Sequence, residues 1–356
     1  MVETKLSYSP NFVVHPGETL RDELEFLNLS QVELSQRIGL SEKHISQIIN
    51  GEDPITSDTA IKLELILGMP ATFWSNLQKN YELNLARIAS EKRIIQEVKE
   101  GKKFICYAEL VELGFVEKSK DWMIKTQNLL KFFGVNSLSY IKITEATAFR
   151  QASGEFNQHS LAAWLRCGEI EANKIEIGEF NKMAIKEIIP KLKKLTTHSE
   201  GFGCKLQELC ASVGIVVVFT PYFKNTKVNG SARWINNKAV IQLNTRGEYS
   251  DIFWFTFFHE LGHIFLHGVK DKFLDYQGKT KDEKESEADK FAADMLIKTI
   301  DLNKFLENKP LTKQKVETFA KSIGISASIV LGRLAHDKIV SWKGVACLRD
   351  RLIIKI

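Results

Sequence analysis

The segment His259-Glu260-Leu261-Gly262-His263 carries the clearest chemical signal in this chain, with two histidines four positions apart and a glutamate between them. Residues four apart share one face of an α-helix, so the two imidazoles can hold one Zn²⁺ while Glu260 addresses a water molecule beside it. The alternative is a buried histidine pair that is satisfied by ordinary hydrogen bonds. Aromatic and aliphatic residues surround the motif and predict a buried helix over 251–267, where unpaired polar groups would be costly.

A third ligand is required, because catalytic zinc sites use three protein ligands and leave a fourth position open. A helix that begins near Glu283 offers three glutamates. Glu285 shares a face with small residues that would let this helix approach the histidine helix, and we expect it to be the ligand. Glu287 remains the alternative ligand. A non-functional reading is that these glutamates simply suit the positive N-terminus of a helix.

Two residues near the expected ligands, Asp289 and His267, have supporting roles in this prediction. Asp289, one turn after Glu285, is placed to accept the free N–H of a ligating imidazole. His267 continues the row of His259 and His263, but Gly268 is expected to end the helix. We therefore expect His267 to interact with the helix dipole rather than to take part in catalysis.

A small mixed sheet is expected before the histidine helix. The β-branched run over 214–219 predicts a strand, and residues 230–235 and 238–243 predict a hairpin around Asn236-Asn237. An extended substrate could add to the edge of this sheet near Ser231, Arg233 and Trp234, which is a hypothesis about strand addition.

The N-terminal region reads as a bundle of short helices. Ser30 and Glu33 predict the start of a helix, and Gly39 predicts the turn that follows it. Ser41 is expected to cap a second helix that ends near Gly51. In a helix-turn-helix unit this second helix lies in the major groove, and its polar face could read bases. The alternative is the solvated face of a structural helix. The candidate DNA-contacting residues are Gln31, Ser41, Lys43, His44, Ser46, Gln47 and Asn50.

Length, composition and charge set the limits of the fold. A chain of 356 residues with 44% apolar and 26% charged residues predicts two or three globular domains. Its apolar runs are too short to cross a bilayer, and no signal peptide is apparent. The five scattered cysteines are typical of reduced thiols. We therefore expect a cytoplasmic protein without a membrane partner. Residues 1–90 hold 7 basic against 12 acidic residues and 91–356 hold 42 against 32, which supports a separate N-terminal module.

The N-terminal motifs resemble HigA-type antitoxins of the XRE helix-turn-helix class. The resemblance covers about 75 residues and rests on the segments 15–18, 29–31, 55–60, 67–68 and 73–74. It implies operator binding as a homodimer, with Gln31 near a phosphate and the helix from Ser41 to Asn50 reading bases. The acidic balance departs from what a DNA-binding module usually shows.

Residues 204 to about 345 resemble the ImmA/IrrE family of zinc metallopeptidases. The resemblance rests on Ser231-Ala232-Arg233-Trp234, on the segment 253–268 and on the segment 285–293. It implies His259 and His263 as zinc ligands, Glu285 as the third ligand and Glu260 as the catalytic base. The proline that usually closes the second motif is absent, because Ile297 is followed by Lys298.

Together these patterns predict an α+β, mostly helical chain. We expect a disordered or extended N-terminus (1–14), an XRE/HigA-like domain (15–90), a helical connector (91–200), a zincin-like metallopeptidase domain with a helical extension (201–345) and a tail (346–356). The expected function is a DNA-binding regulator with a gluzincin-like zinc endopeptidase that cleaves a repressor or antitoxin in a stress, toxin-antitoxin or mobile-element response. The alternative is a non-catalytic repressor or antitoxin whose metal-binding fold senses a signal or binds a partner.

Overall fold

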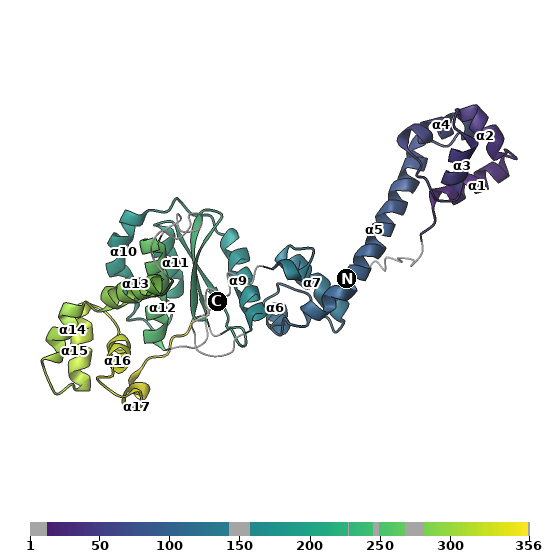
Figure 1. Cartoon of the computed structure of the whole chain (residues 1–356). Coiled ribbons are helices and arrows are strands. Elements are labelled where there is room, and N and C mark those ends of the chain that lie inside the picture. Colours follow the sequence, from purple (N-terminus) through teal and green to yellow (C-terminus); the bar gives the residue numbers. More distant parts are fainter. Residues whose placement is uncertain (1–12, 142–156, 227, 245–248, 268–280, 355–356) are drawn as a thin grey trace. The chain divides into compact units, whose positions relative to one another are not determined.

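The computed structural model describes residues 13–141, 157–226, 228–244, 249–267 and 281–354, and it confirms a mostly helical α+β protein (Figure 1). The chain divides into two compact units, Met1–Lys99 and Glu100–Ile356. Most of the predicted N-terminal extension lies outside the described residues. None of the helices in the described part of the chain has the length and apolar character that a membrane span requires.

The first unit is a helical bundle made of α1 (Pro16–Phe26), α2 (Gln31–Ile38), α3 (Glu42–Ile49), α4 (Ser57–Leu67) and the start of α5 (Ala71–Gly101). The predicted caps are present: Ser30 and Glu33 form a capping box, Gly39 adopts a left-handed φ of 68° after α2, and the Ser41 side chain caps α3. The core residues Leu20, Leu34, Ile45, Ile48, Leu63 and Trp74 are fully buried.

A three-stranded mixed sheet lies at the centre of the second unit. Its strands are β1 (Ile215–Thr220), β2 (Gly230–Ile235) and β3 (Lys238–Asn244), in the order β1-β3-β2. β1 pairs parallel to β3, and β2 pairs antiparallel to β3. The predicted turn is confirmed, since Asn236 and Asn237 have φ angles of 48° and 65°, as a type I′ hairpin turn requires.

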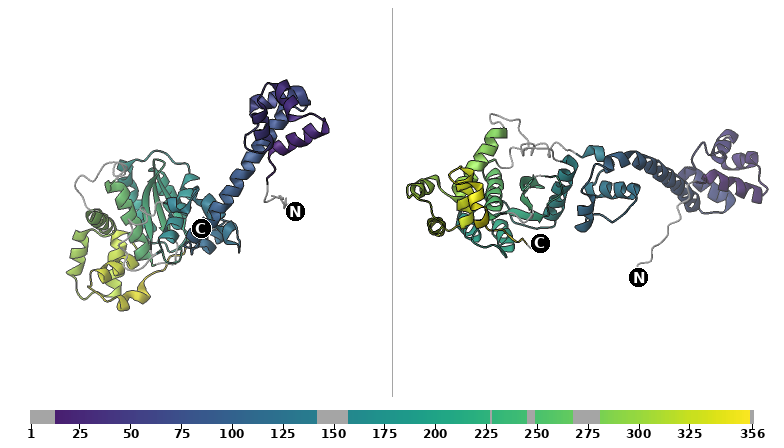
Figure 2. Two further views of the ribbon diagram at one scale, coloured as in Figure 1. Left: turned by 45° about the vertical axis from the view of Figure 1, so that its right-hand side comes forward. Right: turned by 90° about the horizontal axis from the view of Figure 1, so that it is seen from below.

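Helices cover both faces of the sheet (Figure 1, Figure 2). On one face, α9 (Gln158–Asn173) packs its Ala172 against Val216, Val218 and Val240. On the other face, α10 (Lys182–Leu195), α11 (Gly203–Ala211) and α12 (Ser250–His267) share a core with the inward residues of β1 and β3. The region 91–200 therefore differs from the expected connector, because α9 and α10 are layers of the sheet-containing unit.

The preceding helices form a smaller cluster of their own. α6 (Tyr107–Glu112), α7 (Trp122–Phe133) and the 3₁₀ turn η1 (Leu138–Tyr140) pack with part of α9 around Phe104, Leu129 and Trp164. α7 ends at Gly134, which adopts a left-handed φ of 68°. All five cysteines are free thiols, and three of them are buried.

The C-terminal helices complete the second unit: α13 (Lys281–Leu296), α14 (Thr299–Leu306), α15 (Lys313–Ile323), α16 (Ala327–His336), α17 (Trp342–Val345) and the 3₁₀ turn η3 (Ala346–Leu348) (Figure 2). The predicted tail is held against this unit. Arg349 forms an ion pair with Asp251 at the start of α12, and Ile353 forms a bridge with Glu200.

Candidate metal centre and DNA-binding helices

The helix α12 is buried because its apolar side chains point in almost every direction. Phe257, Phe258 and Leu261 are fully buried beside the His-Glu-x-x-His segment. On the side that faces α13, a Cβ atom at Gly262 would lie 3.3 Å from the Cα of Ala288. The predicted close approach of the two helices through small residues is therefore observed, and it brings Glu285 to the histidine row.

His259, His263 and Glu285 meet at one point. The Nε2 atoms of the two histidines are 3.0 Å apart, and Oε2 of Glu285 lies 3.2 Å from Nε2 of His259 and 3.6 Å from Nε2 of His263. Each residue offers one ligand atom to this cluster, and each is only partly buried. The centre can therefore be reached from solvent on one side.

These separations match a tetrahedral zinc site. Zinc binds imidazole nitrogen and carboxylate oxygen at about 2.0–2.2 Å, so two ligand atoms at a tetrahedral ion lie about 3.3 Å apart. The three observed separations differ from this value by no more than a few tenths of an ångström. Three ligands also leave the fourth position open, as catalytic zinc requires.

The electrostatics of the cluster also favour a cation. Burial lowers the pKa of His259, but hydrogen bonds to Asp289 and Glu285 outweigh burial and raise that pKa to about 10. Hydrogen bonds from the two histidines hold the pKa of Glu285 well below its usual range. Two imidazole nitrogens and a carboxylate oxygen facing one another require a positive charge between them, either a proton or a metal ion.

Asp289 lies behind the first histidine, as expected. Its Oδ1 is 2.8 Å from Nδ1 of His259, and an ionised carboxylate can only accept, so Nδ1–H donates. This bond directs Nε2 of His259 towards the cluster. Glu287 lies instead beside His267, with Oε2 3.9 Å from Nδ1, and outside the three-residue cluster. His267 also lies 3.4 Å from the carbonyl oxygen of Lys284.

Glu260 projects from α12 towards the sheet and is 6% exposed. Burial raises the pKa of its carboxyl group, while the neighbouring histidines act in the opposite direction. The carboxylate accepts a hydrogen bond from the backbone N–H of Ala232 in β2. A Cβ atom at Gly230 would lie 2.9 Å from Cγ of Glu260, so only glycine leaves room for this arrangement.

Gly230 and Ala232 were not assigned a role at the site from the sequence, although Ala232 belongs to one of the motifs that carry the resemblance. Ala232 lies between two residues that were proposed for the substrate strand, and alternation along a strand would have placed it on the opposite face from them. The role of Gly230 depends on which helix packs against β2, and local sequence carries no signal for that.

The three proposed substrate-strand residues lie on β2, but their side chains separate. Ser231 and Arg233 point to the α9 face, where Arg233 donates to the carbonyl of Leu165 at 2.8 Å and to Oε1 of Gln242 at 3.1 Å. Trp234 points to the α12 face and packs edge to face on Phe180. None of these three side chains belongs to the His259–His263–Glu285 cluster.

β2 is an edge strand, and its backbone faces outwards. Asn244 donates to the carbonyl of Asn229, so the hydrogen-bonded positions on β2 are the odd-numbered residues. The N–H and C=O groups of Ala232 and Trp234 point away from β3. Among the described strands, none pairs with this side of β2.

The candidate DNA-contacting residues lie on or beside α2 and α3. Gln31, Ser41, Lys43 and Asn50 are exposed, and His44, Ser46 and Gln47 are half-buried. The hydroxyl of Ser41 caps His44 N, the His44 ring lies 3.3 Å from Asp53, and Asn50 donates to Ser46 at 3.3 Å. Ile45, Ile48 and Ile49 on the other side of α3 face the core.

Comparisons with known proteins fall on the same two regions. The model of the IrrE N-terminal-like domain of peptidase family M78 matches residues 210–335, and a helix-turn-helix model matches residues 20–74. Virulence-associated protein I of Dichelobacter nodosus is 38% identical over 74 residues, which are 20% of this chain and 68% of that protein. The helix-turn-helix regulator YddM of Escherichia coli is 29% identical over 68 residues, 19% of this chain and 72% of that protein.

Solved structures match a similar share of the chain. An antidote protein of the HigA family from Coxiella burnetii is 38% identical, with a TM-score of 0.23, over 24% of this chain and 92% of that one. PA4674 of Pseudomonas aeruginosa in complex with its operator DNA is 35% identical, with a TM-score of 0.23, over 25% and 94% of the two chains. This chain joins an XRE-type helix-turn-helix domain to an IrrE-like domain of peptidase family M78.

Proposed function

We propose that this protein is a DNA-binding regulator whose second unit is a zinc-dependent endopeptidase, and that its substrate is a repressor or antitoxin protein. The observation that carries the proposal is the cluster of His259, His263 and Glu285, with separations of 3.0, 3.2 and 3.6 Å between their ligand atoms. A base would have no purpose in a site that only holds a metal, and Glu260 lies beside this cluster.

Each residue has a distinct task in the proposed reaction. His259, His263 and Glu285 would hold Zn²⁺, which supplies a Lewis acid that polarises a peptide carbonyl and acidifies water. Glu260 would take the proton from the attacking water and return it to the departing amine. Asp289 would keep His259 in the tautomer whose Nε2 faces the ion.

The outer edge of β2 would hold the substrate in an extended conformation. The C=O group of Ala232 points away from β3 and would accept a hydrogen bond from an added strand, while the N–H group of Ala232 donates to Glu260, against which β2 lies directly. Strand addition near Ser231, Arg233 and Trp234 would use the backbone of β2, so it does not require the side chains of Ser231 and Arg233, which point to the α9 face.

The first unit would bind double-stranded operator DNA as a homodimer. In helix-turn-helix proteins the second helix enters the major groove, and dimers match the two half-sites of an operator. Here α3 has the exposed or half-buried side chains Lys43, Ser46, Gln47 and Asn50. The match of a helix-turn-helix model to residues 20–74 supports this assignment.

Cleavage of candidate partner proteins tests the proposal. Full-length wild type and Glu260→Gln would be incubated with the products of neighbouring genes, and zinc content would be measured for both proteins. We expect wild type to shorten one partner and Glu260→Gln to bind zinc equally but leave the partner intact. Equal cleavage by both proteins would remove Glu260 from the mechanism. Zinc binding by both without any cleavage would favour a regulator that only senses or binds.

A further inference from the structure

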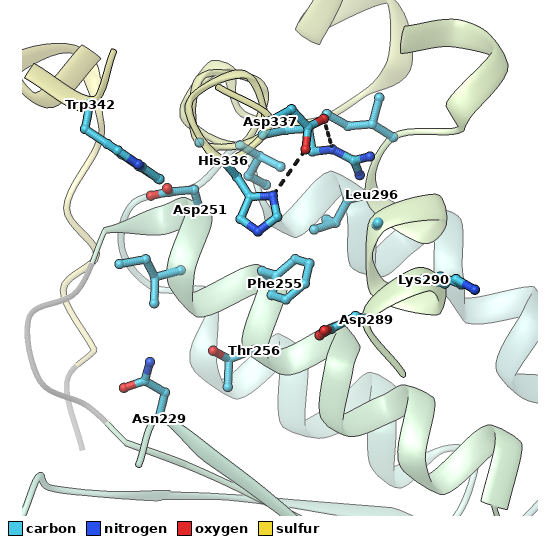
Figure 3. A pocket seen from close by; sticks show the side chains of 16 residues that line it. Asn229, Asp251, Phe255, Thr256, Asp289, Lys290, Leu296, His336, Asp337 and Trp342 are labelled. Carbon is cyan, nitrogen blue, oxygen red and sulfur yellow. Dashed lines mark hydrogen bonds and ion pairs between the residues drawn. The ribbon is translucent and has the colours of Figure 1, made fainter. Parts of the chain in front are cut away.

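A cavity of about 450 Å³ adjoins the metal centre, between α12, α13 and the C-terminal end of α16 (Figure 3). It shares residues with the site: Asp289, which holds His259, and Thr256, which lies one helical turn before Glu260, both line it. Figure 3 shows the side chains of Phe255, Thr256 and Asp289 around this space. The sequence patterns gave no indication of it, because its walls come from segments that lie far apart in the sequence, from Asn229 to Trp342.

The walls of this cavity are mainly apolar. Ile252 and Phe255 from α12, Ala293 and Leu296 from α13 and Ile329 from α16 line it. Phe255 is 37% exposed, whereas its neighbours Phe253, Trp254, Phe257 and Phe258 are at most 5% exposed. An aromatic ring on a buried helix is thus left accessible within a concave surface, which is the usual character of a ligand pocket.

Most of the charged groups around the cavity are paired within the protein, and the side chain of Lys290, which also lines it, points away from the space (Figure 3). Arg349 binds Asp251, Arg333 and His336 bind Asp337, and His259 binds Asp289. A charged ligand side chain would have to displace one of these partners, at the cost of an unpaired charge. The cavity is therefore suited to an uncharged apolar group.

The cavity lies along the path of a strand added to β2. Gly230 contacts both Thr256 and Glu260, and Asn229, which precedes it, lines the cavity. The step from Glu260 to Thr256 is one helical turn, about 5.4 Å, and an extended chain advances about 3.4 Å per residue. A peptide that is held beside Glu260 would therefore place a side chain at the cavity one or two residues from the bond that is cut.

We propose that this cavity selects the substrate by accepting one large apolar side chain, such as that of leucine, methionine or phenylalanine, one or two residues from the scissile bond. This inference rests on the proposed peptidase function, because it uses the same site and the same substrate strand. It names a class of substrate sequence: a segment with a bulky apolar residue beside the cut.

Binding of peptide hydroxamates separates this inference from catalysis. The zinc-loaded full-length chain would be titrated with two series of hydroxamates that carry Leu, Phe, Ala or Asp at the first or at the second residue from the zinc-binding group. In at least one series we expect Leu and Phe to bind at least tenfold more tightly than Ala or Asp, as expected for an apolar pocket. Equal affinity for all four peptides in both series would overturn the proposal.

A variant that fills the cavity supplies the second readout. Ala293→Phe should reduce the preference for Leu and Phe to less than threefold while zinc content and melting temperature stay unchanged. Ala108→Phe, at an exposed position on α6, is the matched control and should keep the wild-type preference. An unchanged preference in Ala293→Phe would assign the selectivity to another surface. Selective binding without any protein cleavage would contradict only the peptidase function, and cleavage without selectivity would contradict only the pocket.

Discussion

Oδ1 of Asp289 lies 2.8 Å from Nδ1 of His259, on the opposite side of the imidazole from the atom that faces His263 and Glu285. Such a bond orients a ligating imidazole and increases its basicity. We expect Asp289→Ala to weaken zinc affinity by about 10- to 100-fold, measured by competition with a chromogenic chelator. Asp294→Ala, an exposed position further along α13, should bind zinc like wild type. Equal affinity in both variants would show that the hydrogen bond does not support the metal.

The choice between two glutamates on α13 can be tested directly. Glu285 lies within 3.6 Å of both histidine Nε2 atoms, whereas Oε2 of Glu287 lies 3.9 Å from Nδ1 of His267. Purified Glu285→Ala should lose most of its bound zinc, because two histidines alone cannot complete the site. Glu287→Ala should keep one zinc ion per chain by elemental analysis. The reverse pattern would make Glu287 the ligand.

Removal of the metal should destabilise the second unit. Nε2 of His259 lies 3.0 Å from Nε2 of His263 and 3.2 Å from Oε2 of Glu285. Without a metal ion, these short distances require a proton that is shared between the three atoms. Dialysis against a strong chelator should lower the melting temperature of the wild-type chain, because zinc binds the folded state in preference to the unfolded one. Stoichiometric Zn²⁺ should restore it. A Glu285→Ala chain should show no change on chelation, and a change equal to that of wild type would locate the stabilising ion elsewhere.

Features that depend on neighbouring residues could be predicted from local sequence patterns. Features that depend on packing between distant segments could not. The hairpin turn at Asn236-Asn237 and the caps at Ser30 and Ser41 depend on residues within a few positions, so their residue types indicate them. By contrast, α9 is an amphipathic helix that could cover any apolar surface, and only the fold shows that it covers the sheet. The bond between Asp251 and Arg349 joins residues 98 positions apart, and neither residue is unusual in its local sequence.

Glycine at position 230 should be necessary for the placement of Glu260. A Cβ atom there would lie 2.6 Å from Cγ2 of Thr256 and 2.9 Å from Cγ of Glu260, so Gly230→Ala must move one of these side chains. We expect kcat to fall by about 100-fold while zinc content stays at the wild-type level, because a displacement of about 1 Å can have such an effect. At Gly178 an added Cβ atom would meet nothing within 4 Å. Gly178→Ala should thus retain activity, and full activity in Gly230→Ala would show that β2 does not restrain Glu260.

The ion pair of Asp251 and Arg349 should hold the C-terminal segment to the first turn of α12. Both side chains are 8% exposed, and Arg349 also stacks 3.9 Å above the ring of Tyr249. Burial raises the pKa of Asp251, and Arg349 opposes that effect. Arg349→Met would leave a buried carboxylate unpaired and should lower the free energy of unfolding by about 3–5 kcal/mol. The double variant Asp251→Asn with Arg349→Met should recover most of this loss in denaturant titrations, because no unpaired charge remains. If the double variant is as unstable as the single one, the loss comes from packing around Arg349 rather than from the buried charge.

DNA recognition by α3 should be separable from catalysis. Gln47 is half-buried on α3, and an amide side chain that bonds an adenine edge contributes about 1–3 kcal/mol of discrimination. For DNA selected by the wild-type chain from a random-sequence pool, we expect Gln47→Ala to weaken binding by about tenfold or more in fluorescence anisotropy. Cleavage of the protein substrate should be unchanged. Gln314→Ala, an exposed glutamine on α15, is the control and should affect neither activity. Wild-type DNA affinity in Gln47→Ala would show that this side chain does not read the operator, and it would leave the other polar residues of α3 as the candidates.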